Sequence, residues 1–368
     1  MQITTQRPAA ERDPFVSAGQ LLTGFVLLIA TLGFLWWGFL LLRGSNELNH
    51  FFIAAFAIVW GVAGVGLLFL SLNRIVESFS DTVRRIVQPY VFVGPAALIL
   101  IWFLVIPTIR TAYLSLLNSD SSTFVGLSNY GAVFTDPQML ESFRNNILWM
   151  VFGTFFCVAL GLLIAVLADR SRFEPVAKAT IFMPMAISFV GAAVIWRFVY
   201  YYQPPGQAQI GLQNAIITGL GLPPQTWIVN QPWNVFFLIL ILIWMQTGFA
   251  MVIFSAALKG VPEDLLEAGR IDGANERRIF FNIIVPYIRG TIITVTTTIL
   301  IFTLKIFDVV IAMTGGQYGT EVIATQFYRQ FFQNRNFGYG SAIAMVLMIA
   351  VIPVMIYNLR QAGKQEAF

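Results

Sequence analysis

The chain has 368 residues, of which 57% are hydrophobic and only 11% charged. A soluble domain does not reach that composition, so the sequence predicts an all-α integral membrane protein and excludes a soluble enzyme or binding module. The formal net charge is +4, but arginine clusters interleaved with aromatic residues are missing, which excludes a nucleic-acid partner. Cys157 and His50 are the single cysteine and histidine, so neither an internal disulfide nor a Cys- or His-based metal centre is expected.

The first part of the chain contains three predicted membrane helices. Leu21–Leu42 is long enough to span a bilayer and too long for the apolar region of a signal peptide. Phe51–Leu72 is the second predicted span, and about Tyr90–Ile109 is the third. Between them, the charged amphipathic segment Asn73–Gln88 is predicted to lie at the inner membrane surface.

Five further apolar runs complete the predicted bundle. They cover about Asn146–Ala168, Lys178–Tyr200, Trp233–Leu258, Thr291–Met313 and Gly338–Tyr357. Eight transmembrane helices place both termini on the same side of the membrane.

The distribution of basic residues predicts which side that is. Most of them fall on the face that holds the termini and the 259–289 loop. They are Arg7, Arg12, Arg74, Arg84, Arg85, Arg170, Arg172, Lys178, Lys259, Arg270, Arg277, Arg278, Arg289, Arg360 and Lys364. The positive-inside rule therefore predicts that both termini and this loop are cytoplasmic.

The 259–289 loop carries start and stop signals for two short helices. Pro262 suits the first position of a helix, and Glu263 adds negative charge at the positive end of the helix dipole. Gly273 is predicted to end this helix with a positive φ, just after Arg270 in its last turn. Asn275 can then cap a second helix. The sequence predicts a helix, a sharp glycine turn and a second helix.

This segment resembles the cytoplasmic EAA loop of importer-type ABC transporter permeases. The family pattern is Glu-Ala-Ala, three residues, Gly, nine residues, Ile, one residue and Leu-Pro. It is present here as Glu267-Ala268-Gly269, Gly273, Ile283 and Val285-Pro286, with Gly269 and Val285 departing from the pattern. The alternative interpretation is an ordinary amphipathic loop helix of a membrane protein, which would not explain the fixed spacing.

Further motifs in the family order extend the resemblance. They include Phe124–Tyr130 (Phe-Val-Gly-Leu-Ser-Asn-Tyr), Thr314–Gly316 and Phe337–Ala342. The resemblance implies a type I ABC importer permease fold in residues 90–368, with six transmembrane helices and the coupling loop. Residues 1–89 are predicted to add two N-terminal helices and the inner-surface segment, similar to the extra helices of maltose-permease-type subunits.

The resemblance implies that the EAA loop docks on a separate ATPase subunit and transmits its motion to the membrane helices. The residues expected to serve this coupling are Glu267, Ala268, Gly269, Arg270, Asp272 and Gly273. No phosphate-binding loop of the form GxxxxGK[ST] occurs in the chain, so ATP is expected to bind and be hydrolysed on partner subunits. The chain is therefore predicted to hold no cofactor, to have no catalytic residues and not to be an enzyme.

The sixth and seventh predicted spans contain the candidate translocation site. A polar solute needs hydrogen-bonding groups and flat apolar faces there, and several of these positions match the sugar site of maltose-type permeases. The candidates are Trp244, Met245, Gln246, Phe249, Phe302, Thr303, Lys305 and Ile306. Helix packing is the alternative role for the aromatic residues, and an i,i+3 salt bridge to Asp308 is the alternative for Lys305.

The sequence as a whole predicts the permease of a bacterial inner-membrane ABC importer for a small carbohydrate. It is also similar to cyanobacterial permeases for glucosylglycerol, sucrose or trehalose. The implied partners are a second, homologous permease chain, two cytoplasmic ATPase subunits and an external solute-binding protein. The alternatives are an ion-coupled secondary transporter, which usually has buried midplane carboxylates and inverted repeats, and a membrane enzyme, which needs an acid–base pair or metal ligands.

Overall fold

The computed structural model describes residues 18–44 and 49–365, and this part of the chain is helical apart from turns, loops and isolated bridges such as that between Leu117 and Phe124. Six of the described helices are long and apolar enough to cross a membrane, and two bent helix pairs raise the number to as many as eight. This agrees with the predicted all-α class and its eight spans. By its internal contacts the chain divides into two compact units, one ending at Ile109 and the other beginning at Arg110.

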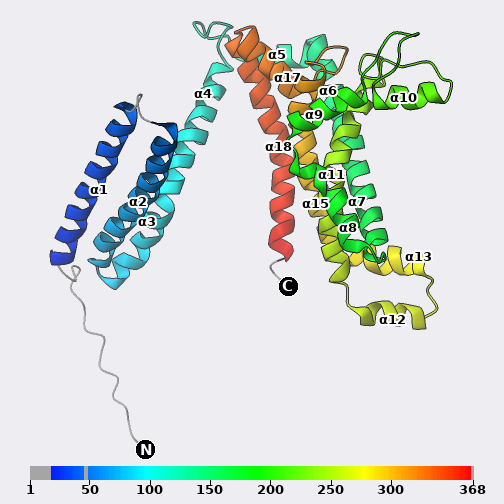
Figure 1. The fold of residues 1–368 in the computed structure, drawn as a ribbon. Helices are drawn as coiled ribbons and strands as arrows, with labels where there is room; N and C mark the ends of the chain where they lie inside the picture. The colour runs from blue at the N-terminus through cyan, green and yellow to red at the C-terminus, as the bar shows by residue number, and fades with distance from the viewer. Residues whose placement is uncertain (1–17, 45–48, 366–368) are drawn as a thin grey trace, which may run out of the picture. The chain divides into compact units, whose positions relative to one another are not determined.

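The first unit consists mainly of α1 (Ala18–Gly44), α2 (His50–Glu77) and α3 (Asp81–Leu100), which pack side by side (Figure 1). In the contact between α1 and α2, the indole N–H of Trp60 donates a hydrogen bond to the Phe34 carbonyl oxygen (3.1 Å). Most of the large apolar side chains of these helices are exposed, as expected for helices whose outer surface is solvated by lipid.

The predicted amphipathic segment Asn73–Gln88 is not one element, because α2 extends to Glu77 and α3 begins at Asp81. From there the helix continues through η1 (Ile101–Val105) into α4 (Ile106–Leu114), so the third apolar run is longer than predicted. The contact division falls inside this run. The boundary at 89/90 between an extension and a core stays a prediction.

The second unit is a bundle of long helices around α11, whose side chains are buried along most of its length. Figure 1 shows α7, α11, α15 and α18 running along one another. Their bounds, with those of the segments leading into α7, are α6 (Pro137–Leu148), η2 (Trp149–Gly153), α7 (Thr154–Asp169), α11 (Asn234–Lys259), α15 (Arg289–Leu304) and α18 (Phe337–Gln365). Cys157, Met251, Phe254 and Ile299 pack together where α7, α11 and α15 meet.

Short helices close the two ends of this bundle (Figure 1). One end carries α5 (Ser128–Thr135), α10 (Leu212–Gly219) and α17 (Ile323–Tyr328). The other end carries α12 (Glu263–Ile271) and α13 (Glu276–Ile279), together with the last turns of α18. The predicted coupling loop therefore lies at the opposite end of the unit from α17.

The fifth predicted span is not a straight helix. Lys178–Tyr200 was expected to run without interruption, but α8 (Glu174–Phe182) with η3 (Met183–Ala186) meets α9 (Phe189–Val199) at an angle of 102°. Pro184 lies in η3 and has no N–H to donate. Ser188 begins α9 anew, because its Oγ accepts a hydrogen bond from the Gly191 N–H (3.1 Å).

The seventh span also differs from its prediction, Thr291–Met313. α15 ends at Leu304, residues 305–307 are not helical, and α16 (Asp308–Met313) is a separate short helix. At its other end, α15 meets the 276–287 helix at an angle of 69°. Lys305 therefore lies just beyond the end of a helix instead of inside one.

Candidate functional site

The predicted coupling loop folds as its sequence indicates, with one difference at its start. α12 has Glu263 and Asp264 in its first turn and Arg270 in its last turn. Pro262 is the residue before the helix, with ψ 134°, and not the first helical residue as predicted. Gly273 has φ +79°, a conformation in which side chains are strained, so the predicted glycine turn is confirmed.

The second helix of this segment folds back against the first. Asn275 caps α13, since its side-chain oxygen accepts a hydrogen bond from the Arg278 N–H (2.9 Å), as predicted. Gly269 is buried against this helix, and a Cβ at this position would lie only 2.7 Å from Ile283 Cδ1. The small size of Gly269 therefore serves the close contact between the two parts of the segment.

The other face of α12 is exposed. Glu267, Ala268 and Asp272 all lie on the surface, as an interface with a partner requires. Sequence reasoning missed Ile271, whose side chain is 85% exposed at the end of this helix. The sequence does contain a signal for this residue, namely an isoleucine inside a highly charged loop. Exposed apolar side chains next to charged ones mark interaction surfaces.

Arg270 is paired inside the segment. Its Nε donates a hydrogen bond to Glu276 Oε1 (3.0 Å), and both side chains are exposed. Glu276 Oε2 also lies 3.9 Å from Arg170 Nη2 at the end of α7. The arginine therefore helps to fix the turn between α12 and α13.

The eight candidate translocation residues do not share one environment. The buried ones are Met245, Gln246, Thr303 and Ile306; the half-buried ones are Trp244 and Phe249; the exposed ones are Phe302 and Lys305. Met245 and Ile306 belong to the same apolar cluster, and the ring of Trp244 packs against Trp196 of α9 at a centroid distance of 5.8 Å. These residues stay predicted site residues.

Gln246 is the most unusual of the eight. Its side chain is 4% exposed, and its Oε1 has no hydrogen-bond partner in the described part of the chain. Leaving a buried polar group unpaired costs about 1–3 kcal/mol. The neighbouring Thr247 has no such deficit, because its hydroxyl donates to the Ile243 carbonyl oxygen (2.6 Å).

Gly248 brings α11 against the bent span. A Cβ at this position would lie 2.4 Å from the Ile181 carbonyl oxygen and 2.7 Å from Phe182 Cα. Because both are backbone atoms, they cannot move aside without displacing α8. The bend between α8 and α9 therefore lies next to the stretch of α11 that carries Gln246.

The alternative role predicted for Lys305, an i,i+3 salt bridge to Asp308, does not fit the geometry of the structure. No ion pair joins Lys305 to Asp308 among residues 18–44 and 49–365, and both side chains are exposed. The i,i+3 spacing brings side chains together only on a helix, and α15 ends at Leu304. The ammonium group instead lies 5.7 Å from the centre of the Phe302 ring, a favourable cation–π arrangement.

Sequence reasoning missed two buried asparagines at the end of α6. Asn146 Nδ2 donates to the Leu304 carbonyl oxygen (2.8 Å), and Asn146 Oδ1 accepts from the Ile323 N–H (2.8 Å). Asn145 Nδ2 donates to the carbonyl oxygens of Gly319 and Glu321 (2.8 Å each). Together they hold the end of α15 and the loop before α17. The only local sequence feature that could have indicated these buried asparagines is that two of them occur in succession just before an apolar run.

An ion pair between a buried carboxylate and a half-buried arginine fixes the same loop. Glu321 Oε2 lies 2.7 Å from Arg329 Nη2, and that guanidinium also donates to the Gly315 carbonyl oxygen (3.1 Å). Burial raises the pKa of Glu321, while a hydrogen bond from Thr325 and the charge of Arg329 act in the opposite direction. The loop between α16 and α17 is thus fixed by the asparagines of α6 and by Arg329, which follows α17.

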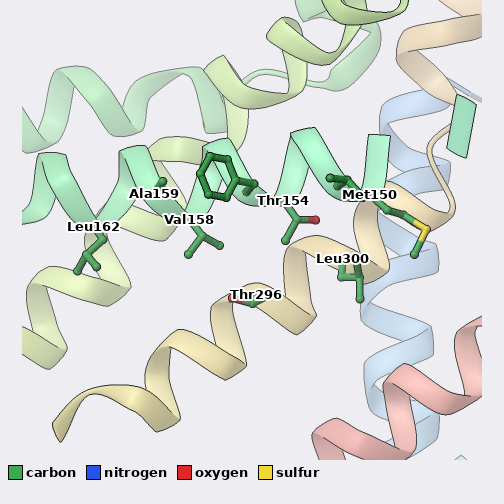
Figure 2. A pocket seen from close by; sticks show the side chains of 9 residues that line it. Met150, Thr154, Val158, Ala159, Leu162, Thr296 and Leu300 are labelled. Carbon is green, nitrogen blue, oxygen red and sulfur yellow. The ribbon is translucent and has the colours of Figure 1, made fainter. Parts of the chain in front are cut away.

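A large cavity at these helices is apolar and is lined by none of the eight candidates. It is an open groove of about 480 Å³ between α7 and α15. Figure 2 shows Thr154, Val158 and Leu162 of α7 facing Thr296 and Leu300 of α15 across it. In the described ranges, no three His, Cys, Asp or Glu side chains come together as metal ligands.

Comparisons with known proteins identify the family. Residues 157–362 match the family described as "Binding-protein-dependent transport system inner membrane component". The chain is 54% identical to the osmoprotective compounds uptake permease protein of Synechocystis sp., over 75% of this chain and 99% of that protein. It is 51% identical to the alpha-glucoside transport system permease protein of Rhizobium meliloti, over 79% of this chain and 87% of the relative.

The fold has a solved counterpart. A crystal structure of a bacterial ABC transporter that imports the polysaccharide alginate superposes with a TM-score of 0.67 at 19% identity, over 77% of this chain and 98% of that one. The predicted type I importer permease fold is therefore confirmed. The chain is a multi-pass inner-membrane transport subunit of an ABC importer, not an enzyme or a secondary transporter, and it belongs to the family of binding-protein-dependent transport system inner-membrane components.

Proposed function

We propose that this subunit carries a small carbohydrate or a sugar-like compatible solute into the cell, driven by ATP on partner subunits. The observation that carries the proposal is the shape of the coupling segment. A rigid turn at Gly273 and the close contact of Gly269 hold α12 at one end of the bundle with its acidic and apolar face exposed. An exposed apolar side chain such as Ile271 favours a protein partner over solvent.

The coupling partner is an ATPase subunit on the cytoplasmic side, where the positive-inside rule places this loop. Glu267 and Asp272 offer negative charge to the partner, while Ala268 lets the two surfaces approach closely. Two ATPase subunits, a second permease chain that differs from this one and an external solute-binding protein complete the proposed importer. ATP binds to the ATPase subunits and not to this chain.

The names of the relatives support the substrate class. One is named for the uptake of osmoprotective compounds and the other for alpha-glucosides, so glucosylglycerol, sucrose, trehalose and maltose are the proposed solutes. Gln246 offers a buried amide oxygen that has no hydrogen-bond partner among the described residues and that can accept a hydrogen bond from a sugar hydroxyl. The ring of Phe302 is partly exposed beside Lys305, and such a pair suits the apolar and polar faces of a sugar.

Uptake by the assembled importer in proteoliposomes tests this substrate class. The panel contains radiolabelled glucosylglycerol, sucrose, trehalose and maltose, with methionine and histidine as solutes of another class. ATP-dependent uptake of at least one sugar-like solute, without uptake of the amino acids, is expected. Uptake of an amino acid in preference to every sugar would overturn the proposal.

The variant Gln246→Leu is expected to raise the solute concentration at half-maximal uptake by about 2–10-fold. A hydrogen bond to a neutral group contributes about 0.5–1.5 kcal/mol, which corresponds to that range. Leucine has a similar volume and needs no partner, so the amount of assembled complex should not fall. Titration of uptake at matched protein levels measures the effect, and an unchanged half-maximal concentration would remove Gln246 from the site.

The variant Lys305→Met separates a solute contact from a structural role. If Lys305 contacts the solute, uptake falls in Lys305→Met. Uptake should change little in Asp308→Asn, because no ion pair connects these two residues. Thermal stability of the purified complex should be the same for both variants. Equal loss of stability in both would show that the two side chains support each other after all.

A further inference from the structure

Lys178 connects the ends of three helices. Its ammonium group lies 2.5 Å from Asp169 Oδ1 at the end of α7 and 2.6 Å from Glu174 Oε1 in its own helix, α8. It also donates a hydrogen bond to the Ser255 hydroxyl of α11. The Lys178 side chain is only 18% exposed, so this charge is largely removed from solvent and depends on its partners.

The neighbouring groups complete a compact ion cluster. Ser255 donates its own hydroxyl proton to Asp169 Oδ1 (2.7 Å), and Lys259 at the end of α11 lies 2.5 Å from Glu174 Oε1. Two carboxylates and two ammonium groups thus balance in charge. The cluster, defined as Asp169, Glu174, Lys178, Ser255 and Lys259, fixes α7, α8 and α11 relative to one another.

This ion cluster lies beside the coupling segment. Arg170 follows Asp169 directly and approaches Glu276 of α13 at 3.9 Å. An open cavity of about 240 Å³ separates the helix ends from the segment, with Asp169 and Lys259 on one side and Leu266 and Phe280 on the other. Because apolar packing is incomplete here, movement of the coupling segment has to reach the bundle through the remaining contacts.

We infer that Lys178 is a positioning residue of the transport cycle, which makes the ends of α7, α8 and α11 move as one body when the coupling segment is displaced. The bent span then transmits this movement, because α8 continues into the 102° bend with α9. Without the ammonium group, Asp169 and Glu174 repel each other and the ion pair that joins α8 to α7 is lost, so that only Lys259 still links Glu174 of the ion cluster to α11. The inference rests on the proposed ATP-driven function.

The test uses the assembled importer in proteoliposomes and compares unmodified protein with Lys178→Met, Lys178→Arg and Asp169→Asn. Arg172→Met is the matched control, since Arg172 lies in the short turn between α7 and α8 and its guanidinium stacks over the Phe173 ring (4.8 Å) outside the ion cluster. For each variant, solute taken up per ATP hydrolysed is measured with the solute that the unmodified importer transports fastest. The amount of assembled complex is determined in parallel.

Lys178→Met and Asp169→Asn are expected to lower uptake per ATP by about tenfold, within the range of typical coupling free energies. Lys178→Arg should keep most of the uptake per ATP. For Arg172→Met, the uptake per ATP should stay within about twofold of that of the unmodified protein. An unchanged ratio in Lys178→Met, or loss of assembly in both uncharged variants, would overturn the inference. If the unmodified importer itself shows no ATP-dependent uptake, the proposed function fails instead, so the two failures are distinguishable.

Discussion

Replacing Gly273 with valine is expected to lower ATP-dependent uptake at least about tenfold, while the chain still inserts and folds. Gly273 has φ +79°, and a β-branched residue held in that region is strained by about 1–3 kcal/mol. Apart from Gly273 and its two chain neighbours, no atom of the described residues lies within 4 Å of the position that a Cβ would take. The effect should therefore come from reorientation of α12, measured as loss of uptake and of ATPase binding in reconstituted complexes.

Two controls separate coupling from general strain. Gly273→Asn should keep most of the activity, because asparagine tolerates positive φ better than other non-glycine residues. Gly126→Val introduces the same kind of strain at φ +61° in a loop outside the coupling segment, so ATPase binding should be unaffected. Normal uptake in Gly273→Val would contradict the role assigned to this turn.

The second large effect is expected for Asn146→Leu. The leucine has a similar volume, but it leaves the Leu304 carbonyl and the Ile323 N–H, both bonded to Asn146, without a partner. Each unsatisfied buried group costs about 1–3 kcal/mol. The midpoint of thermal unfolding in detergent should fall by at least about 5 °C, with lower uptake because the end of α15 is no longer fixed.

The control for this variant is Asn334→Leu. Asn334 is exposed, and its side-chain amide donates to the Gln330 side chain (3.1 Å), so a shift of the unfolding midpoint of less than about 2 °C is expected. Equal stability of Asn146→Leu and the unmodified protein would show that the hydrogen bonds of Asn146 do not hold the end of α15.

The features predicted well from the sequence depend on local chemistry. Gly273 and Asn275 determine the turn and the cap of the coupling segment through their own backbone and side chain. The long apolar runs are predictable in the same way, because every backbone group of a spanning segment has to be paired within a helix. The ends of several runs were misplaced, and the interruptions inside the fifth and seventh spans were not predicted.

The features that could not be predicted depend on contacts between distant parts of the chain. Asn146 bonds to groups 158 and 177 residues away, and no periodicity indicates such partners. Pro184 is a local signal for a break in the fifth span, but neither the 102° angle nor the close contact of Gly248 in α11 with the Ile181 carbonyl could be read from it. Lys305 was assigned to a helix because the residues around it are apolar, although α15 ends one residue earlier.

The most direct test of the central claim is the energy source for uptake in proteoliposomes that contain this chain with its partner permease, ATPase subunits and solute-loaded binding protein. ATP-driven import predicts uptake that requires ATP in the compartment holding the ATPase subunits and that persists when ionophores abolish proton and sodium gradients. Uptake that proceeds without ATP and follows an imposed ion gradient would contradict it.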